Sequence, residues 1–169
     1  MRAGRIAALL AVACAAAGCG GEDDGLVDAQ TAHVRFGYPK GWQRQAKGGA
    51  FTVARIEGGR PVAQLTVLER PVRATTATLA VAALQAGRLI GHDYKRGAVR
   101  PVRIENADSG SRLSYSYVSD DEPRHPTEGT DVVAVRDRNV YVVRVTAVPG
   151  KVSAADVEAI VKSVALKGD

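Results

Sequence analysis

Two apolar runs in the C-terminal third constrain the fold more than any other feature. Residues 132–135 are continuously apolar, and residues 140–145 are nearly so, with Arg144 as the exception. Strands that are apolar on both faces belong in the middle of a sheet that is covered on both sides. The polar residues 136–139 between the two runs predict a hairpin turn. We therefore expect strands over 130–135 and 140–148 at the centre of a sheet, with other elements on each face.

Two amphipathic segments can supply that cover. The first can be capped by Thr75 or Thr76 and ended by Gly91, and its apolar stripe is predicted at Leu79, Ala82, Ala83, Ala86, Leu89 and Ile90. The second can be capped by Ser153, with Asp156 three residues later, and its stripe is predicted at Val157, Ile160, Val161 and Val164. One helix on each face satisfies the two-sided pattern.

Alternating apolar and polar residues predict further strands with one buried face. These strands are expected over 33–38, 50–57, 62–69, 99–105 and 113–117. Residues 58–61, which include two glycines, are typical of a hairpin turn. Pro101 favours an edge position for the 99–105 strand, and residues 106–110 predict a polar turn. Trp42 is expected to close an edge of the core, with a ligand platform as the alternative.

The N-terminal residues have the composition of a secretory signal. Arg2 and Arg5 precede an apolar run over 6–17, which is shorter than the roughly 20 residues that a transmembrane helix needs. The run ends in Ala-Ala-Gly-Cys19, which resembles the lipobox of bacterial lipoproteins. We predict that residues 1–18 are a signal peptide and that Cys19 is lipidated, anchoring the protein at the extracytoplasmic face of the cell membrane. Lipidation at Cys14, secretion without lipid and an uncleaved anchor helix are the alternatives.

Charge is distributed unevenly after the signal. Residues 19–32 are predicted to be a flexible acidic tether because they contain Gly and Asp and few large apolar residues. The remaining domain, 33–169, carries the excess of basic residues within a formal net charge of +5. Such a domain is attracted to an anionic bilayer or wall polymer, or simply has a solvated arginine surface. No nucleic-acid-binding pattern is present, and with Cys14 removed and Cys19 lipidated no intramolecular disulfide is expected.

The order of the predicted elements, together with the motif Phe-Gly-Tyr-Pro-Lys-Gly-Trp at 36–42, resembles the PsbP/Mog1-like α/β/α sandwich. Within that fold the chain resembles actinobacterial LpqN/LpqT-type lipoproteins, which share a signal of this kind. The resemblance implies an α+β domain whose antiparallel sheet has helices packed on its faces. It also implies a non-catalytic binding or assembly role, and it assigns no binding residue.

Two groups of residues are candidates for contact with a partner or a ligand. The polar loop 120–128 has the composition of a solvated loop, and contact with a partner is the candidate role for its residues Asp120, Asp121, Arg124 and His125. Its spacing does not fit a calcium loop, which disfavours a metal site. Tyr115 and Tyr117 share one strand face, where they can line a pocket or extend their hydroxyl groups to solvent.

No pattern in the sequence indicates catalysis. His33, His92 and His125 are scattered and have no zinc-protease spacing. Residues 108–111 lack the glycine that precedes the nucleophile of a hydrolase elbow, and the mature chain has no free thiol. We therefore predict a monomeric, non-enzymatic protein with no cofactor, which binds an envelope protein. A carrier that holds a small apolar or lipid ligand between helix and sheet is the alternative.

Overall fold

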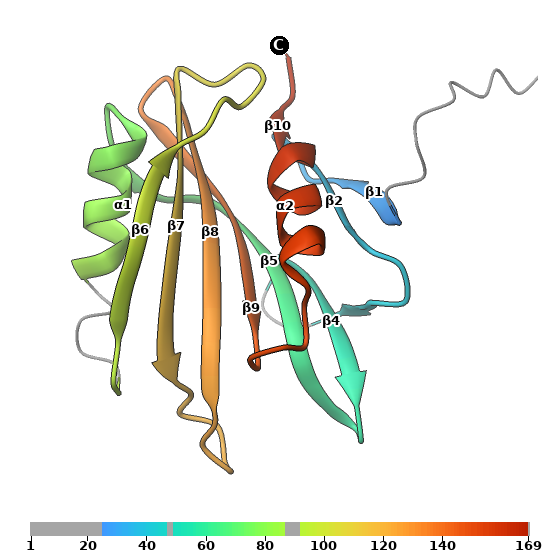
Figure 1. The fold of residues 1–169 in the computed structure, drawn as a ribbon. Helices are drawn as coiled ribbons and strands as arrows, with labels where there is room; N and C mark the ends of the chain where they lie inside the picture. Colours follow the sequence, from blue (N-terminus) through green and yellow to red (C-terminus); the bar gives the residue numbers. More distant parts are fainter. Residues whose placement is uncertain (1–24, 47–48, 87–91, 169) are drawn as a thin grey trace, which may run out of the picture.

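Seven antiparallel strands form the central layer of the protein (Figure 1). The computed structural model describes residues 25–46, 49–86 and 92–168. The order across the large sheet is β3 (Gln43–Gln45), β4 (Phe51–Glu57), β5 (Arg60–Arg73), β9 (Asn139–Ala147), β8 (Pro126–Arg136), β7 (Ser109–Val118) and β6 (Lys95–Pro101). A small sheet contains β1 (Leu26–Gln30), β2 (Val34–Pro39) and β10 (Ala165–Leu166). Helices α1 (Ala77–Ala86) and α2 (Ala154–Ser163) pack on opposite faces of the large sheet, which confirms the α+β class.

The predicted central hairpin is confirmed. Strands β8 and β9 lie in the middle of the large sheet and are joined by Asp137 and Arg138, whose φ angles are 51° and 64°. Val132 and Val143 face the core on the α2 side, whereas Val133 and Val142 face the core on the α1 side. Both strands therefore contribute to two apolar clusters, one on each face.

Helix α2 has the predicted cap and the predicted buried face. Ser153 Oγ accepts a hydrogen bond from the Asp156 backbone N–H at 3.0 Å, and the Asp156 carboxylate accepts from the Ser153 backbone N–H. Ile160, Val161 and Val164 are buried in the α2-side cluster. The small sheet continues this layer, because Val34, Phe36 and Leu166 belong to the same cluster.

The predicted buried face of α1 is wrong. The residues that face the sheet are Ala77, Ala80, Val81 and Gln85, whereas Leu79 is 56% exposed and Ala82, Ala83 and Ala86 are also exposed. Alanine is abundant on both sides of this helix, so its apolar residues do not define a single face. Leu89, Ile90 and the predicted end at Gly91 lie outside the described residues.

The predicted flexible tether over 19–32 is wrong for its last part. Strand β1 occupies Leu26–Gln30 and pairs antiparallel with β2. Leu26 packs against the core and covers Gly37, where a Cβ would lie 2.7 Å from Leu26 Cδ1. The partner strand lies in another segment of the chain, so local composition did not reveal the pairing. Residues 19–24 lie outside the described residues.

The edge strand β6 has the predicted place in the sheet, but its residue range is shifted by four positions. Strand β6 is an edge strand, as Pro101 predicted, but it covers Lys95–Pro101 rather than 99–105. The glycine turn is also shorter than expected, because β5 already begins at Arg60, after Gly58 and Gly59.

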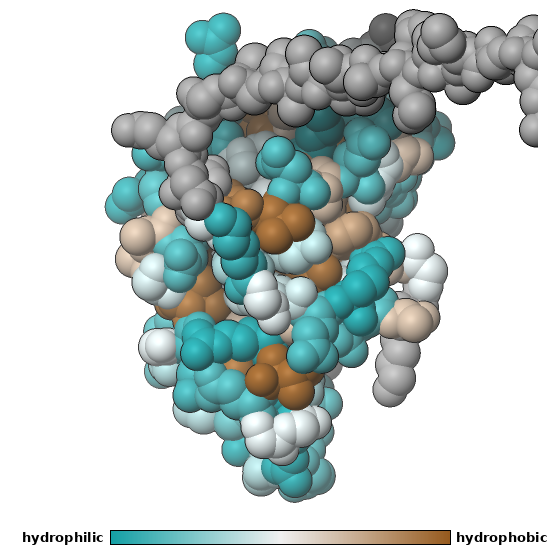
Figure 2. Space-filling view, turned by 90° about the vertical axis from the view of Figure 1, so that its right-hand side faces the viewer, coloured by the Kyte–Doolittle hydropathy of each residue, from teal (hydrophilic) through white to brown (hydrophobic). Residues whose placement is uncertain are grey.

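Trp42 packs, partly buried, against the α2-side cluster, which confirms its core-edge role. Figure 2 shows that the described residues on the side facing the viewer expose hydrophobic groups in small patches separated by hydrophilic ones.

Candidate functional site

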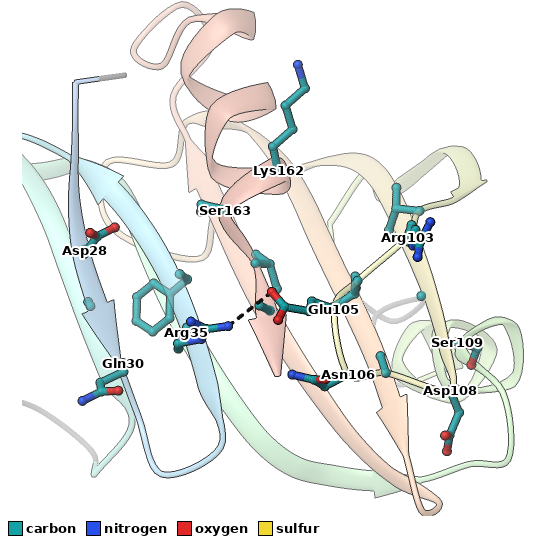
Figure 3. Close-up of a pocket in the computed structure, with 18 residues that line it drawn as sticks. Asp28, Gln30, Arg35, Arg103, Glu105, Asn106, Asp108, Ser109, Lys162 and Ser163 are labelled. Carbon is teal, nitrogen blue, oxygen red and sulfur yellow. Dashed lines mark hydrogen bonds and ion pairs between the residues drawn. The ribbon is translucent and has the colours of Figure 1, made fainter. Parts of the chain in front are cut away.

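A groove of about 1120 Å³ lies at the end of the molecule that carries the C-terminus (Figures 1 and 3). Strands β1 and β2 form one wall, and residues 102–108, which connect β6 to β7, contribute the opposite wall together with the start of β7. The end of α2 and the start of β10 lie between the walls. The groove therefore combines residues that are far apart in the sequence.

The short strand β10 connects the two walls. It pairs antiparallel with β2, and Ala165 forms a parallel bridge with Glu105. The Leu166 backbone N–H donates to the Glu105 carbonyl at 3.0 Å, and Asn106 Nδ2 donates to the Leu166 carbonyl at 2.9 Å. Both walls are thus bonded to the same two-residue strand, which fixes the distance between them.

The loop that forms the second wall is held closely against the sheet. The Val102 backbone N–H donates to the Gly110 carbonyl at 3.1 Å, and a Cβ at position 110 would lie 2.5 Å from the Val102 oxygen. Glycine is therefore required at this close approach. Ser109 Oγ accepts from the Ala77 backbone N–H at 2.9 Å, so the loop is also bonded to the start of α1.

The groove combines buried apolar groups with a charged rim. Phe36, Ile104 and Val164 line it and belong to the α2-side core. The charged residues that line it are Asp28, Arg35, Arg103, Glu105, Asp108 and Lys162. Arg35 Nη2 lies 3.2 Å from Glu105 Oε2, and Figure 3 shows this ion pair crossing from β2 to the opposite wall. Acidic and basic residues balance, so the lining has no formal net charge.

The hydroxyl group of Ser163, which lines the groove, makes structural hydrogen bonds. Ser163 Oγ accepts from the Gly37 backbone N–H at 2.8 Å and donates to the Ile160 carbonyl at 2.7 Å. Among the described residues, no histidine or cysteine lines the groove. The arrangement is suited to binding an amphipathic surface.

The partner-contact residues predicted from the sequence lie at the opposite end of the molecule, in the loop between β7 and β8 (Figure 1). His125 Nδ1 lies 3.0 Å from Ser119 Oγ, and Asp120 Oδ1 lies 3.4 Å from His92 Nε2. Asp120, Asp121 and Arg124 are exposed. Asp121 and His125 line a depression of about 80 Å³, whereas Asp120 and Arg124 do not.

The two tyrosines proposed for a pocket are in different environments. Tyr115 is 6% exposed, its hydroxyl donates to Asp131 Oδ1 at 3.0 Å, and its ring covers Gly129. Tyr115 thus fills space on the α1 side of the sheet. Tyr117 stacks on it with ring centroids 6.1 Å apart and lines the same small depression as Asp121.

A second polar cluster surrounds Glu69 on β5. His33 Nδ1 lies 2.9 Å from Glu69 Oε2, and Thr31 Oγ1 donates to Glu69 Oε1. Burial acts to raise the pKa of Glu69, but the hydrogen bonds from Thr31 and His33 outweigh it, so the pKa is lowered. Arg70 Nη2 lies 3.0 Å from His33 Nε2. The cluster joins the β1–β2 turn to β5.

Two further observations concern anchoring and metals. Cys14, Cys19 and the predicted signal peptide lie outside the described residues. Within residues 25–46, 49–86 and 92–168, no helix has the length and apolar character needed to cross a membrane. The same residues contain no cluster of three or more His, Cys, Asp or Glu side chains that could hold a metal ion.

Known protein families and curated proteins provide no match to this sequence. Solved structures do: cyanobacterial PsbP (CyanoP) from Synechocystis sp. PCC 6803 matches 89% of this chain and 98% of its own, with a TM-score of 0.55 and 14% identity. The chain has a PsbP-like fold. LpqN from Mycobacterium tuberculosis, described as involved in cell envelope biogenesis, matches 85% of this chain and 91% of its own, with a TM-score of 0.50 and 10% identity. These likenesses show the fold alone.

The groove of this PsbP-like fold was missed by sequence reasoning. Residues 106–110 were predicted only as a polar turn, and nothing local indicated that Glu105 bridges to Ala165. Val102, Ile104 and Ala107 were one available signal, because these apolar residues lie in a connection and pack against the core. Apolar residues in a connection indicate that the loop packs against the hydrophobic core.

Proposed function

We propose that this protein is a non-catalytic binding module of the bacterial cell envelope and that the groove of Figure 3 binds a segment of an envelope protein. The observation that carries the proposal is the groove itself, which has buried apolar residues at its base and balanced charges around it. Protein interfaces combine an apolar centre with a polar rim in this way. The neutral lining does not favour a polyanion.

The lipid-ligand carrier is the weaker proposal. A pocket for a lipid is mostly apolar and buries most of its ligand. The groove instead carries six charged side chains, and Tyr115, one of the two residues proposed to line a helix–sheet pocket, is packed against Gly129. Native mass spectrometry of protein purified from its own membrane tests this choice, because a stoichiometric adduct of lipid mass would favour the carrier.

A lipid at Cys19 would place the groove near the membrane. Residues 20–25 separate Cys19 from β1, and a chain of that length spans at most about 20 Å when fully extended. Since β1 is part of one groove wall, the bound segment would belong to a protein in or close to the same membrane. The anchor is tested by Cys19→Ala, which should abolish incorporation of a palmitate analogue and release the protein from the membrane fraction.

Site-specific photo-crosslinking in living cells tests the groove. A photoreactive residue at Gln30 or Arg103, both at the groove, should give an adduct with one defined envelope protein, and the same residue at exposed Gln43 on β3 should not, because Gln43 lines neither the groove nor the small depression. Arg35→Glu should weaken the adduct by placing two acids opposite each other, and adding Glu105→Arg should restore it by reversing the ion pair. Equal adducts at all three positions, or no effect of the charge changes, would contradict the proposal.

A further inference from the structure

A small depression lies at the end of the molecule opposite the groove. It has a volume of about 80 Å³ and is lined by the start of β5, the end of β9, and residues of β7, β8 and the loop between them. Since one water molecule occupies about 30 Å³ in the liquid, the space holds the head of a single side chain rather than a nucleotide or an acyl chain. It shares no residue with the groove of Figure 3.

Thr127 brings a buried hydroxyl group to the lining of this depression. The residue is 5% exposed, and its Oγ1 atom is buried without a hydrogen-bond partner in the part of the chain that the structure describes. Buried hydroxyl groups in proteins are normally hydrogen-bonded, so an unpartnered one requires an explanation. Because Thr127 lines the depression, a donor bound there can supply the missing hydrogen bond.

The other groups around the depression select a cation. The carboxylate of Asp121 has no ion-pair partner among the described residues, and the neighbouring acid Asp120 is already close to His92. The Tyr117 side chain provides an aromatic ring, whose face attracts cations. A carboxylate, an aromatic ring and a hydroxyl oxygen together complement a positively charged donor.

His125 also lines the depression. Its Nδ1 atom lies 3.1 Å from the Pro123 carbonyl, which only accepts hydrogen bonds, so this geometry assigns the ring hydrogen to Nδ1. In the neutral ring Nε2 is then an acceptor. The loop is closed at its base by hydrogen bonds from the Ser119 backbone N–H to the His125 carbonyl, at 2.9 Å, and from the His125 backbone N–H to Ser119 Oγ, at 3.3 Å.

We propose that this depression, at Tyr117, Asp121, His125 and Thr127, binds the positively charged head of an arginine or lysine side chain from a partner protein. Among the described residues, Asp121 is the one acid in its lining, and its single charge matches one guanidinium or ammonium group. The site is independent of the groove and would give the protein a second point of contact at its other end.

The test is an NMR titration of the full chain, purified in detergent, with Nα-acetyl-arginine-N-methylamide as the probe. The matched probe is Nα-acetyl-citrulline-N-methylamide, which has nearly the same shape and no charge. We expect the arginine probe to shift the resonances of Thr127 and Tyr117, and the citrulline probe to leave them unchanged. Equal shifts with both probes, or no shift at the solubility limit of the arginine probe, would overturn the proposal.

Matched variants test which side chains contribute to binding of the arginine probe. Asp121→Asn should weaken arginine binding about fivefold, the effect of one partly exposed ion pair, whereas Asp120→Asn should leave it unchanged. Thr127→Val, which conserves volume, should also weaken binding because it removes the hydroxyl oxygen. Arg35→Glu in the groove should have no effect, so the two sites can fail separately. An equal loss in Asp120→Asn and Asp121→Asn would contradict the assignment, because it would reflect general charge.

Discussion

The two faces of the seven-stranded sheet are covered by different kinds of side chains. On the α2 side, large aliphatic and aromatic side chains from β2, β5, β9, β10 and α2 form one continuous cluster. On the α1 side, the helix contributes mainly alanine and valine, and Asp131, which is 0% exposed, lies within the sheet face. Both faces bury an apolar cluster, and the α1 side in addition holds a buried carboxylate that is paired by polar neighbours.

The polar network on the α1 side also supports the cation site. Arg144 Nε lies 3.1 Å from Asp131 Oδ1, and Arg144 Nη2 lies 3.3 Å from Asp131 Oδ2. Tyr115 donates to the same carboxylate and stacks on Tyr117. The network therefore fixes one tyrosine, and that tyrosine positions the next one at the depression. The comparison predicts that damage to the network affects both stability and ligand binding.

The largest effect is expected from Arg144→Ala. This change leaves the buried Asp131 carboxylate without its ion pair, which should reduce the free energy of unfolding by about 4 kcal/mol. Chemical denaturation monitored by circular dichroism measures this free energy of unfolding. The double variant Asp131→Leu/Arg144→Met is the control and should lose much less, because no buried charge remains. A loss below about 1 kcal/mol for Arg144→Ala would mean that the network does not hold this face.

A somewhat smaller effect is expected on the other face from Ile160→Ala. Ile160 is fully buried between α2 and the sheet, and its truncation leaves a cavity, so stability should fall by about 3 kcal/mol. Ile160→Val, which removes one methylene group, should cost about 1 kcal/mol. Unlike Arg144→Ala, neither change should alter the Tyr117 resonance. A shift of that resonance would show that the two faces are coupled.

The same difference explains how much of the fold was predictable. The α2 side was predicted well, because Ser153, Asp156 and the large apolar residues after them define the cap and the face of one helix. The α1 side was not, because alanines occur on all sides of α1 and its buried face includes Gln85, whose Nε2 has no hydrogen-bond partner among the described residues. Hydrophobic periodicity predicts the buried face of a helix only where its two faces differ in hydrophobicity.

The candidate sites follow a similar rule. The loop with Asp121 and His125 was indicated by its own composition, because all its charged residues are neighbours in the sequence. The groove depends on the contact of Glu105 with Ala165 and on the pairing of β1 with β2, which join distant segments. Local patterns contain no information about such contacts, so the groove became visible only in three dimensions.

A smaller, pH-dependent effect is expected at the margin of the α2 side. The pKa of Glu69 is lowered from its ordinary value of 4.5, despite burial, by hydrogen bonds from Thr31 and His33. A lowered pKa in the folded state stabilises the protein above pH 4.5, and this stabilisation is lost as the pH falls through the folded-state value. Glu69→Gln should therefore be less stable than the wild type at neutral pH, and the difference should disappear in acid. A difference that is constant with pH would contradict this account.

The smallest effect is expected from Leu79→Gln, and it tests the orientation of α1 directly. The sequence placed Leu79 in the buried stripe, whereas the structure exposes it and buries Val81. A polar residue at an exposed helix position changes stability by no more than about 0.5 kcal/mol. The matched change Val81→Gln places an amide in the α1-side cluster and should cost about 2 kcal/mol, because a buried polar group loses its hydration. If Leu79→Gln proved the more damaging of the two, the helix would pack through its other face. The surface on this side of the sheet, which includes the depression at Tyr117, would then differ from the one described above.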